Sequence, residues 1–274
     1  MYDADQVLRY IDHNTAAVLA AAAIACVGGT VQYVEGVRRG FADRSHAIPL
    51  GTNLYIFAHD VTYIAMYDRW FGAQGHWFNQ LFWVFILPFA LLELVVFSQL
   101  FRYSRRELLP GLTSAQCLLA LGACQVGAFF LFWFLRSLGP DPLYIVSFTT
   151  TIVVSNLFYI PMTLRRGSRR GQSVLLGSGL LCLSVGWSLV MVQLSPAFRS
   201  PAWLGLLGSN ALLALANLLV LVRFPAWQAS GARPSHTLSQ TSSAPQAALR
   251  ASLPSVALAD AGLTNRVPPA TENS

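Results

Sequence analysis

The chain has 274 residues, of which 54% are hydrophobic and only 11% are charged. A water-soluble domain carries about 25% charged residues, so this composition excludes an ordinary soluble protein and predicts a membrane protein. All basic residues are arginines, and the formal net charge is +6. These arginines stand in short clusters between apolar runs, where membrane topology accounts for them, so no nucleic-acid partner is expected.

Seven apolar runs are long enough to cross a bilayer as helices, which takes about 20 residues each. They predict an all-α bundle of seven transmembrane helices over residues 1–224 and a multi-pass integral membrane protein. The second run is the weakest because it contains His59 and Asp60. The predicted spans are residues 15–34, 49–67, 78–101, 113–135, 143–164, 174–194 and 203–222.

Arginines between these runs predict the orientation of the bundle. Arginine-rich loops stay in the cytoplasm, and rich and poor segments alternate strictly along the chain, which also supports the count of seven. We therefore expect the amino terminus outside and the carboxyl terminus in the cytoplasm. The poor segments hold Arg9, Arg69, Arg136 and Arg199, and the rich ones hold Arg38, Arg39, Arg44, Arg102, Arg105, Arg106, Arg165, Arg166, Arg169, Arg170 and Arg223.

The segments before and after the spans are polar. Residues 1–13 carry three aspartates and a single arginine, so we do not expect a secretory signal, which starts with positive charge. Beyond the last span the chain is rich in Ser, Thr, Ala, Pro and Gln, and such a segment buries too little apolar surface to offset the entropy of ordering. A disordered cytoplasmic tail is expected over residues 225–274, in which 246–263 could form a weak amphipathic helix.

Two carboxylates, Asp60 and Glu93, lie well inside predicted spans. An ionised acid at such depth costs several kcal/mol, so these residues normally face the bundle interior or a wet cavity. They are the first candidates for chemistry, and the alternative is a structural hydrogen bond between helices. Pro88 precedes Glu93 on the same span and removes a backbone hydrogen bond, so we expect a kink beside this acid.

Polar residues at helical spacing surround Asp60 on the second span. Asn53 and Tyr67 are seven residues away on either side and are expected to share its face, with Tyr63 one turn on lying close to it. His59 is expected to point elsewhere, either as a partner of the acid or as an interfacial residue.

Two later spans also carry polar faces. Thr149 and Asn156 share a face of the fifth span, and Asn210 and Asn217 share a face of the seventh. These residues predict either a common polar core or interhelical hydrogen bonds that contribute about 0.6–2 kcal/mol each.

Aromatic residues, among them Trp83 and Phe89, are dense around the two acids. Most should face lipid or pack between helices, but some could line a cavity, where ring faces stabilise a cation by about 2 kcal/mol or more. Burial among apolar groups favours the protonated form of a carboxyl group. A protonated acid among rings is what acid-initiated cyclisation of a polyprenyl chain requires. Aspartate-rich magnesium motifs and metal-ligand cysteine spacings do not occur, so we expect no metal and no cofactor.

Three short motifs resemble one family. Residues 59–63 (His-Asp-Val-Thr-Tyr) resemble the Trp-Glu-x-x-Tyr stretch of the small integral-membrane terpene cyclases of fungal meroterpenoid and indole-diterpene pathways, which have bacterial relatives. Glu93 followed by residues 101–103 (Phe-Arg-Tyr) is similar to that family's acidic residue and its Arg- and aromatic-containing loop. Residues 165–173 (Arg-Arg-Gly-Ser-Arg-Arg-Gly-Gln-Ser) are similar to its Arg-Gly-Ser-x-Arg-Gly-x-Ser loop. The resemblance covers roughly residues 48–222.

The resemblance implies a cyclase acting on a hydrophobic, prenylated small molecule within the bilayer, with Asp60 as proton donor and Glu93 as a second acid or base. The family's catalytic Glu is the shorter Asp60 here, and its acid in the last span has no counterpart. Either Glu93 substitutes for that acid or the reaction differs. The residues expected to bind substrate are Asn53, His59, Tyr63, Trp83, Phe89, Asn156, Asn210 and Asn217.

Two other functions fit the same residues. A small proton-coupled transporter could use the two acids as a relay. A non-enzymatic membrane scaffold or sensor would need neither acid and would bind partners through its tail. The oligomeric state is left open.

Overall fold

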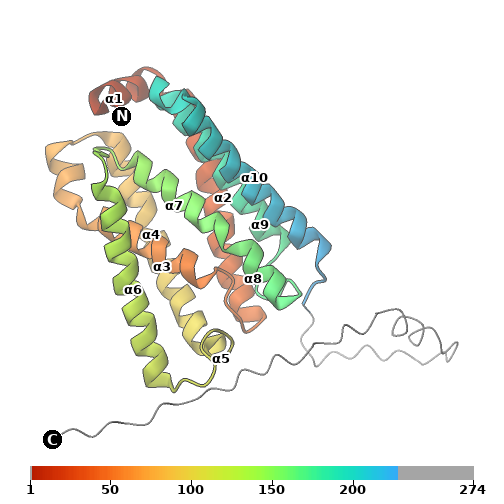
Figure 1. Cartoon of the computed structure of the whole chain (residues 1–274). Coiled ribbons are helices and arrows are strands. Elements are labelled where there is room, and N and C mark those ends of the chain that lie inside the picture. Colours follow the sequence, from red (N-terminus) through yellow and green to blue (C-terminus); the bar gives the residue numbers. More distant parts are fainter. Residues whose placement is uncertain (1, 228–274) are drawn as a thin grey trace, which may run out of the picture. The chain divides into compact units, whose positions relative to one another are not determined.

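The computed structural model describes residues 2–227, and in this range the chain forms helices and connecting loops with no strand (Figure 1). The predicted tail lies outside the described residues from position 228 on, as does the weak helix expected within it. The elements are α1 (Ala4–His13), α2 (Thr15–Ala42), α3 (Leu50–Ala65), the π-helix η1 (Arg69–Ala73), α4 (Trp77–Tyr103), α5 (Arg105–Leu108), α6 (Ser114–Ser137), α7 (Ile145–Leu157), α8 (Tyr159–Arg166), α9 (Val174–Leu194), the 3₁₀-helix η2 (Pro196–Arg199) and α10 (Pro201–Arg223).

Six helices of the described chain are long and apolar enough to cross a membrane, which confirms the prediction of a multi-pass helical membrane protein. Five of them are α2, α4, α6, α9 and α10, and the sixth consists of α7 and α8, which follow each other over Ile145–Arg166. α3 occupies the second predicted span but has only 16 residues, because Pro49 precedes its first turn and the Met66 N–H closes its last turn on the Tyr63 carbonyl. Helix length alone therefore supports six spans rather than seven.

α2 extends eight residues beyond the end expected at residue 34. The apolar run stops there, but Glu35 accepts hydrogen bonds from Arg38 at 2.6 Å and from Arg39 at 3.1 Å. Ion pairs three and four residues apart stabilise a helix, so the polar residues continue α2 beyond its apolar part.

α1 is an amphipathic helix that the apolar runs did not predict. Asp3 caps its first turn by accepting from the Gln6 N–H at 3.1 Å, and its apolar side chains Val7 and Ile11 are fully buried. Beyond one end of α1 the Tyr2 hydroxyl donates to Asp141 at 2.6 Å, and at the other Asp12 accepts from the Trp77 indole N–H at 2.9 Å. Polar contacts at both ends therefore hold α1 against the loop before α7 and the start of α4.

α2 and α9 pack against each other through glycines. A Cβ added at Gly28 would stand 2.3 Å from the Leu183 backbone nitrogen, and one added at Gly186 would stand 2.5 Å from the Ala25 nitrogen. Small residues allow such close approach, which is a common basis of helix association in membranes. This pair forms one side of the structure that positions the candidate site.

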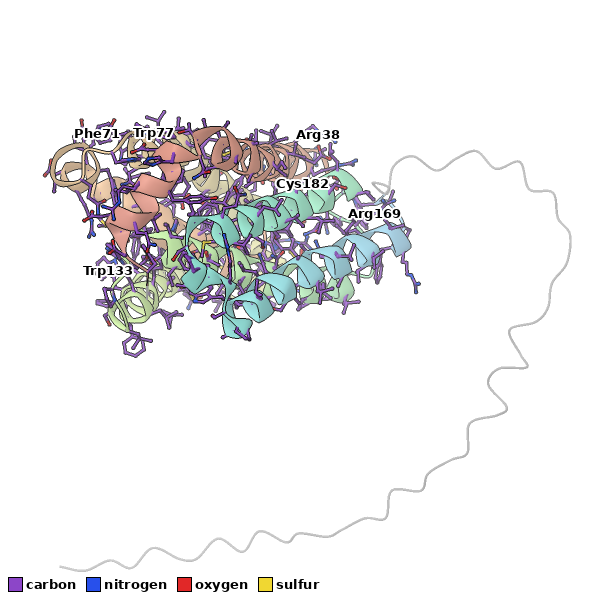
Figure 2. All side chains as sticks on the ribbon, turned by 90° about the horizontal axis from the view of Figure 1, so that it is seen from above. Arg38, Phe71, Trp77, Trp133, Arg169 and Cys182 are labelled. Atoms are coloured by element: carbon purple, nitrogen blue, oxygen red, sulfur yellow. The ribbon has the colours of Figure 1, made fainter. Side chains whose placement is uncertain are left out.

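α3 lies among other helices, with α4, α6 and α7 packed around it (Figure 1). α6 by contrast exposes most of its length, and its large apolar residues Leu119 and Phe130 are 75% and 64% exposed. An apolar exposed surface of this kind suits a lipid environment. Figure 2 shows Phe71 and Trp77 towards one end of the helices, and Arg38 and Arg169 towards the opposite end.

Candidate functional site

The centre of α3 carries the first acid of the site. Asp60 is buried, and its Oδ1 lies 2.6 Å from Nδ1 of His59. Adjacent helical residues normally diverge, but because helices surround α3, His59 is fully buried too and is the partner of the acid. Depending on where the proton lies, the imidazole N–H donates to the carboxylate or the carboxyl O–H donates to the imidazole.

Three rings, from α6, from α7 and from the residue just before α7, enclose the His59 imidazole. The ring centroids of Tyr144, Phe148 and Phe132 lie 4.9, 5.4 and 5.6 Å from its own. Tyr144 also donates to the His59 carbonyl at 3.3 Å, and its backbone adopts a φ of 65°, in the left-handed region. This conformation costs a non-glycine residue about 1 kcal/mol or more and occurs where the surroundings hold the residue in place. His59 therefore has a fixed orientation beside Asp60.

Glu93 is the second acid, and it is fully buried on α4, which runs through Pro88 as one helix. The Tyr33 hydroxyl of α2 donates to its Oε1 at 2.8 Å. Asn53 of α3 donates to the Glu93 backbone carbonyl at 3.4 Å. Three helices thus meet at this acid, and its Oε2 has no hydrogen-bond partner among the described residues.

The Asp60 and Glu93 carboxyl groups are both buried and lie close enough to interact electrostatically. Like charges that share a buried site oppose simultaneous ionisation. At most one of the two acids is therefore expected to be ionised deep in the helix bundle.

A cavity of about 400 Å³ adjoins Asp60, a volume within the range of about 300–1,000 Å³ typical of small-molecule sites. Helices α2, α3, α4, α7 and α9 contribute its walls. Asp60 is the sole ionisable acid or base among its lining residues apart from the weakly acidic Tyr33 and Cys26. The aromatic lining residues are Tyr33, Phe78, Phe82, Phe85, Phe89, Phe148 and Trp187.

A hydrogen bond fixes the orientation of Trp187 in this wall. Its indole N–H donates to the Thr149 hydroxyl at 2.8 Å, and the Phe148 ring packs on its edge with centroids 4.4 Å apart. The Phe82 ring stacks parallel to it at 6.1 Å. The cavity is thus a rigid apolar space with aromatic faces and one carboxyl group.

The three predicted asparagines of later spans lie outside the cavity lining. Asn156 donates to Asn210 at 2.5 Å and to Ser184 at 3.0 Å, and so joins α7, α10 and α9. Asn217 lies two turns further along the same face of α10, is fully buried and has no protein partner for its amide. The expected interhelical bonds between the fifth and seventh spans are present, whereas no residue of α10 lines the cavity.

Asn53, His59, Tyr63 and Trp83, which were also predicted to bind substrate, are not among the cavity-lining residues, whereas Phe89 is. The Tyr63 ring stacks on Trp70 at 4.5 Å, and its hydroxyl donates to the Asn79 carbonyl. Trp83 donates to the Ile64 carbonyl at 3.0 Å and packs beyond the end of α3. The prediction that Tyr67 shares the Asp60 face is wrong, because α3 ends at Ala65 and the Tyr67 side chain is half exposed.

Sequence reasoning missed Tyr33 and Gln32, which both line the cavity from α2. Gln32 donates to the Tyr159 hydroxyl at 2.7 Å, and both partners are buried. Two adjacent polar residues near the end of an otherwise apolar span were the available signal. The contact of Tyr33 with Glu93, sixty residues on, depends on how α2 packs against α4 and could not be predicted from residue spacing.

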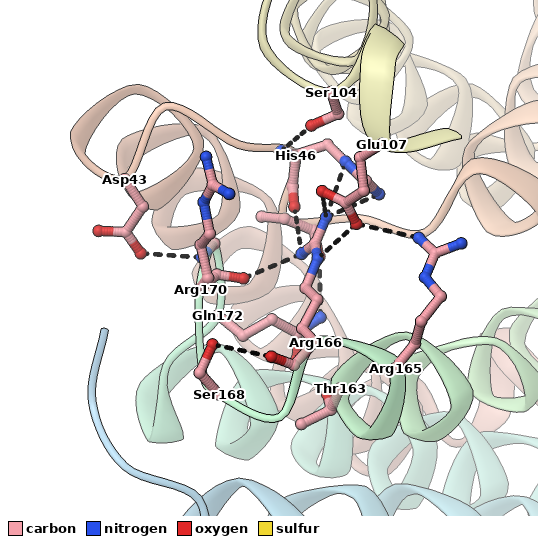
Figure 3. A network of polar contacts seen from close by, with 12 residues as sticks. Asp43, His46, Ser104, Glu107, Thr163, Arg165, Arg166, Ser168, Arg170 and Gln172 are labelled. Atoms are coloured by element: carbon pink, nitrogen blue, oxygen red, sulfur yellow. Dashed lines mark hydrogen bonds and ion pairs between the residues drawn. The ribbon is translucent and has the colours of Figure 1, made fainter. Parts of the chain in front are cut away.

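The arginine-rich loop between α8 and α9 does not reach the cavity. Figure 3 shows Arg166 at the centre of a network, where it donates to the His46 carbonyl at 2.9 Å and to Glu107 at 3.0 Å. The Gly171 N–H donates to Asp43 at 2.8 Å, and the Ser173 hydroxyl donates to Glu35 at 2.7 Å. These contacts join the loop to the end of α2, the loop before α3, and α5. In this structure the loop has a structural role.

Within residues 2–227, no group of three or more His, Cys, Asp or Glu side chains is placed to hold a metal ion. Comparisons of the chain with protein-family models, with curated proteins and with solved structures give no match. The geometry of the Asp60 site and the motifs in the sequence are therefore the features that bear on function.

Proposed function

We propose that this chain is an integral-membrane cyclase that closes rings in a prenylated or terpenoid substrate, starting with a proton from Asp60. One observation carries the proposal: Asp60 is the sole carboxyl group among the lining residues of an apolar cavity rich in aromatic rings. The resemblance of residues 59–63 to the motif of the small integral-membrane terpene cyclases supports the same assignment. Asp60 stands where that motif has its acid.

The reaction would begin when the Asp60 O–H gives its proton to an alkene carbon or an epoxide oxygen of the substrate and leaves a carbocation. Each ring closure then forms a carbon–carbon bond from the electrons of the next double bond and moves the cation along the chain. Loss of a proton from carbon to the Asp60 carboxylate ends the sequence, restores the acid and makes the product an isomer of the substrate. No cofactor enters this balance.

The neighbours of Asp60 suit this cycle. After proton transfer, the carboxylate accepts a hydrogen bond from the His59 imidazole, which limits the cost of a buried charge. The aromatic faces of the wall stabilise a desolvated cation by about 2 kcal/mol or more. An apolar lining also excludes the water that would quench it.

Glu93 would take the place of the acid that the related family carries in its last span. The α10 asparagines cannot serve, because they bond to α7 or lie unpaired outside the cavity. Glu93 instead approaches Asp60 from α4, and Tyr33 donates to its Oε1 at 2.8 Å. Asn53 would position α4 beside α3 through the Glu93 carbonyl.

The same proposal includes seven crossings with the amino terminus outside. Arginine-rich segments meet at one end, where Arg166 contacts His46 and the Arg169 N–H donates to the Pro225 carbonyl. At the other end Arg69 donates to the Pro142 carbonyl. α3 connects the segment of His46 at one end to the segment of Arg69 at the other. The chain would therefore cross the membrane along α3 although this helix is short. Labelling of single introduced cysteines by an impermeant reagent on intact and opened cells tests this topology.

Product analysis tests the cyclase. Membranes that contain the full chain are incubated with farnesylated and geranylgeranylated candidates, and products are separated by chromatography and identified by mass spectrometry. We expect a new product with the same mass as the substrate, and its complete loss in Asp60→Asn. Asp68→Asn makes the same chemical change at an exposed position eight residues on and should retain full activity. If several distinct prenyl substrates return unchanged with the wild-type chain, the cyclase assignment is wrong.

The buried acid pair also favours a second candidate, a proton-coupled carrier. Tyr33 donates to Glu93, Asp60 lies nearby, and the unpartnered Gln32 Oε1 and Asn53 Oδ1 could hold hydrogen-bonded waters that connect these groups. A carrier predicts uptake of a substrate into proteoliposomes that stops when the proton gradient is collapsed, with no new product. Product formation without a gradient would exclude it.

A further inference from the structure

The cavity beside Asp60 reaches the outer surface of the helices at one place. Three of its lining residues are exposed, namely Leu19 and Ala23 on α2 and Leu81 on α4. The remaining lining residues from α3, α7 and α9 are buried or half-buried. The opening therefore lies between α2 and α4, and we refer to Leu19, Ala23 and Leu81 as the α2–α4 mouth.

Polar contacts frame the mouth along both helices. On one side of it, Asp12 just before α2 accepts from Trp77 at the start of α4. On the other side, Tyr33 donates to Glu93, and Gln99 donates to the α2 backbone at 2.9 Å. Between these fixed points, no hydrogen bond or ring pair in the described chain joins residues 15–32 of α2 to residues 77–88 of α4. The two helices are held at their ends and leave a gap between them.

The surface around the mouth is apolar. Val27 on α2 and Val84 on α4 are more than half exposed, and Ile24 is 45% exposed. Both helices belong to the six that are apolar enough to span a membrane. Leu19, Ala23 and Leu81 fall within the apolar runs 15–34 and 78–101, which in a bilayer lie in the hydrocarbon region. The mouth thus faces acyl chains rather than water.

The cavity lining also limits the charge of its occupant. The described lining residues contain no arginine or histidine, and the one carboxyl group among them is that of Asp60. A diphosphate would find no cation and would meet an acid in an apolar space. The lining on α2 runs from Leu19 to Tyr33, which at a rise of 1.5 Å per residue is about 20 Å of helix. Such a space suits an extended, uncharged hydrocarbon chain.

We propose that the α2–α4 mouth is a lateral entrance through which an uncharged polyprenyl chain passes from the hydrocarbon core of the bilayer to Asp60. This inference rests on the proposed function for the identity of the substrate, but entry through the mouth does not require turnover. It predicts that the substrate carries no diphosphate when it enters and that bulk at the mouth blocks binding.

A photoreactive probe tests the entrance in the full-length chain. The protein is reconstituted into phosphatidylcholine vesicles with a geranylgeranyl alcohol that carries a diazirine, irradiated, and digested for peptide mapping by mass spectrometry. We expect labelling within residues 19–33 and 78–89, and its loss when unlabelled geranylgeraniol is added in excess. The corresponding diazirine diphosphate should leave these segments unlabelled.

Two variants add bulk at the mouth. Ala23→Trp combined with Leu81→Trp should abolish labelling of the cavity segments, and Leu81→Trp alone should reduce it if the double variant does not fold. Leu119→Trp places the same ring on the exposed surface of α6, away from the cavity, and should label like the wild-type chain. Unchanged labelling in the mouth variants, or labelling of the cavity by the diphosphate probe, would overturn the entrance.

These results separate the entrance from the reaction. If unlabelled geranylgeraniol and the mouth variants both abolish labelling but the chain forms no cyclised product, the entrance is supported and the cyclase assignment is wrong. Product formation that survives both tryptophans supports the cyclase and rejects the entrance.

Discussion

Replacing Gly28 by alanine should destabilise the protein, because α2 and α9 meet backbone to backbone at this residue. The new Cβ would stand 2.3 Å from the Leu183 nitrogen and 2.6 Å from the Gly179 carbonyl oxygen, whereas ordinary contacts of a Cβ begin at 3.4 Å. Backbone atoms of a helix cannot rotate aside as a flexible side chain does. α2 would therefore have to withdraw from α9 by roughly 1 Å, which loosens packing on both sides of the contact.

The magnitude follows from two opposed effects. Overpacking of this kind costs about 1–3 kcal/mol, and the higher helix propensity of alanine returns up to about 1 kcal/mol. We expect a net loss of about 1–2 kcal/mol in the free energy of unfolding. Gly122→Ala on α6 is the matched control, since its Cβ would meet no atom within 4 Å. It should be neutral or slightly stabilising.

Unfolding in mixed micelles, with increasing dodecyl sulfate and circular dichroism as the signal, measures both variants against the wild-type chain. Gly28→Ala should unfold at a lower dodecyl sulfate fraction than Gly122→Ala. Equal midpoints for the two variants would show that α2 and α9 do not approach as closely as the structure indicates.

Two further predictions concern pH. Burial, together with the positive charges of Arg166 and its neighbours, holds the pKa of the His46 imidazole well below its ordinary value. The folded protein therefore keeps His46 neutral, while the unfolded chain binds a proton at this residue below about pH 6.5. The free energy of unfolding should decrease as the pH is lowered below about 6.5, by up to about 1.4 kcal/mol per pH unit. Thermal unfolding should show this decrease in the wild-type chain and a flatter pH profile in His46→Gln. The hydrogen bond from Trp77, and after it the contact with His76, lowers the pKa of Asp12, so the docking of α1 should be strongest above about pH 4 and weaken as acid protonates Asp12. Hydrogen exchange of α1 amides should rise on acidification in the wild-type chain, and an Asp12→Asn variant that still responds to acid would refute this assignment.

Part of the site could be predicted from residue type and depth. Asp60 and Glu93 were identified because acids inside apolar runs are costly and normally face inwards, and both side chains are buried next to each other. The partnership of Asn156 with a residue of the last span also followed from polar spacing. In each case the residues that gave the prediction lie on one face of one helix, and the residues that share a helix face can be predicted from the period of 3.6 residues per turn.

Other features depended on neighbours that no period reveals. His59 is a partner of Asp60 because α3 is enclosed on several sides, which buries residues that would diverge on an exposed helix. Tyr67 lost its expected place because α3 ends two residues earlier. Tyr63 and Trp83 are occupied by contacts at the end of α3, and Tyr33 reaches Glu93 across the gap between two spans.

The amino-acid sequence by itself determined that this chain forms long apolar helices in a membrane, because lipid leaves the backbone no hydrogen-bond partners outside the helix and the length of each apolar run decides where it can cross. The tertiary structure alone decided which faces meet. Glycines let α2 and α9 pack closely against each other. Contacts join α2 to α4 on either side of a stretch that no hydrogen bond bridges, and the cavity beside this stretch is lined by Asp60 and several aromatic side chains. Packing between distant segments created that space, and packing depends on side-chain shape in three dimensions rather than on spacing along the chain.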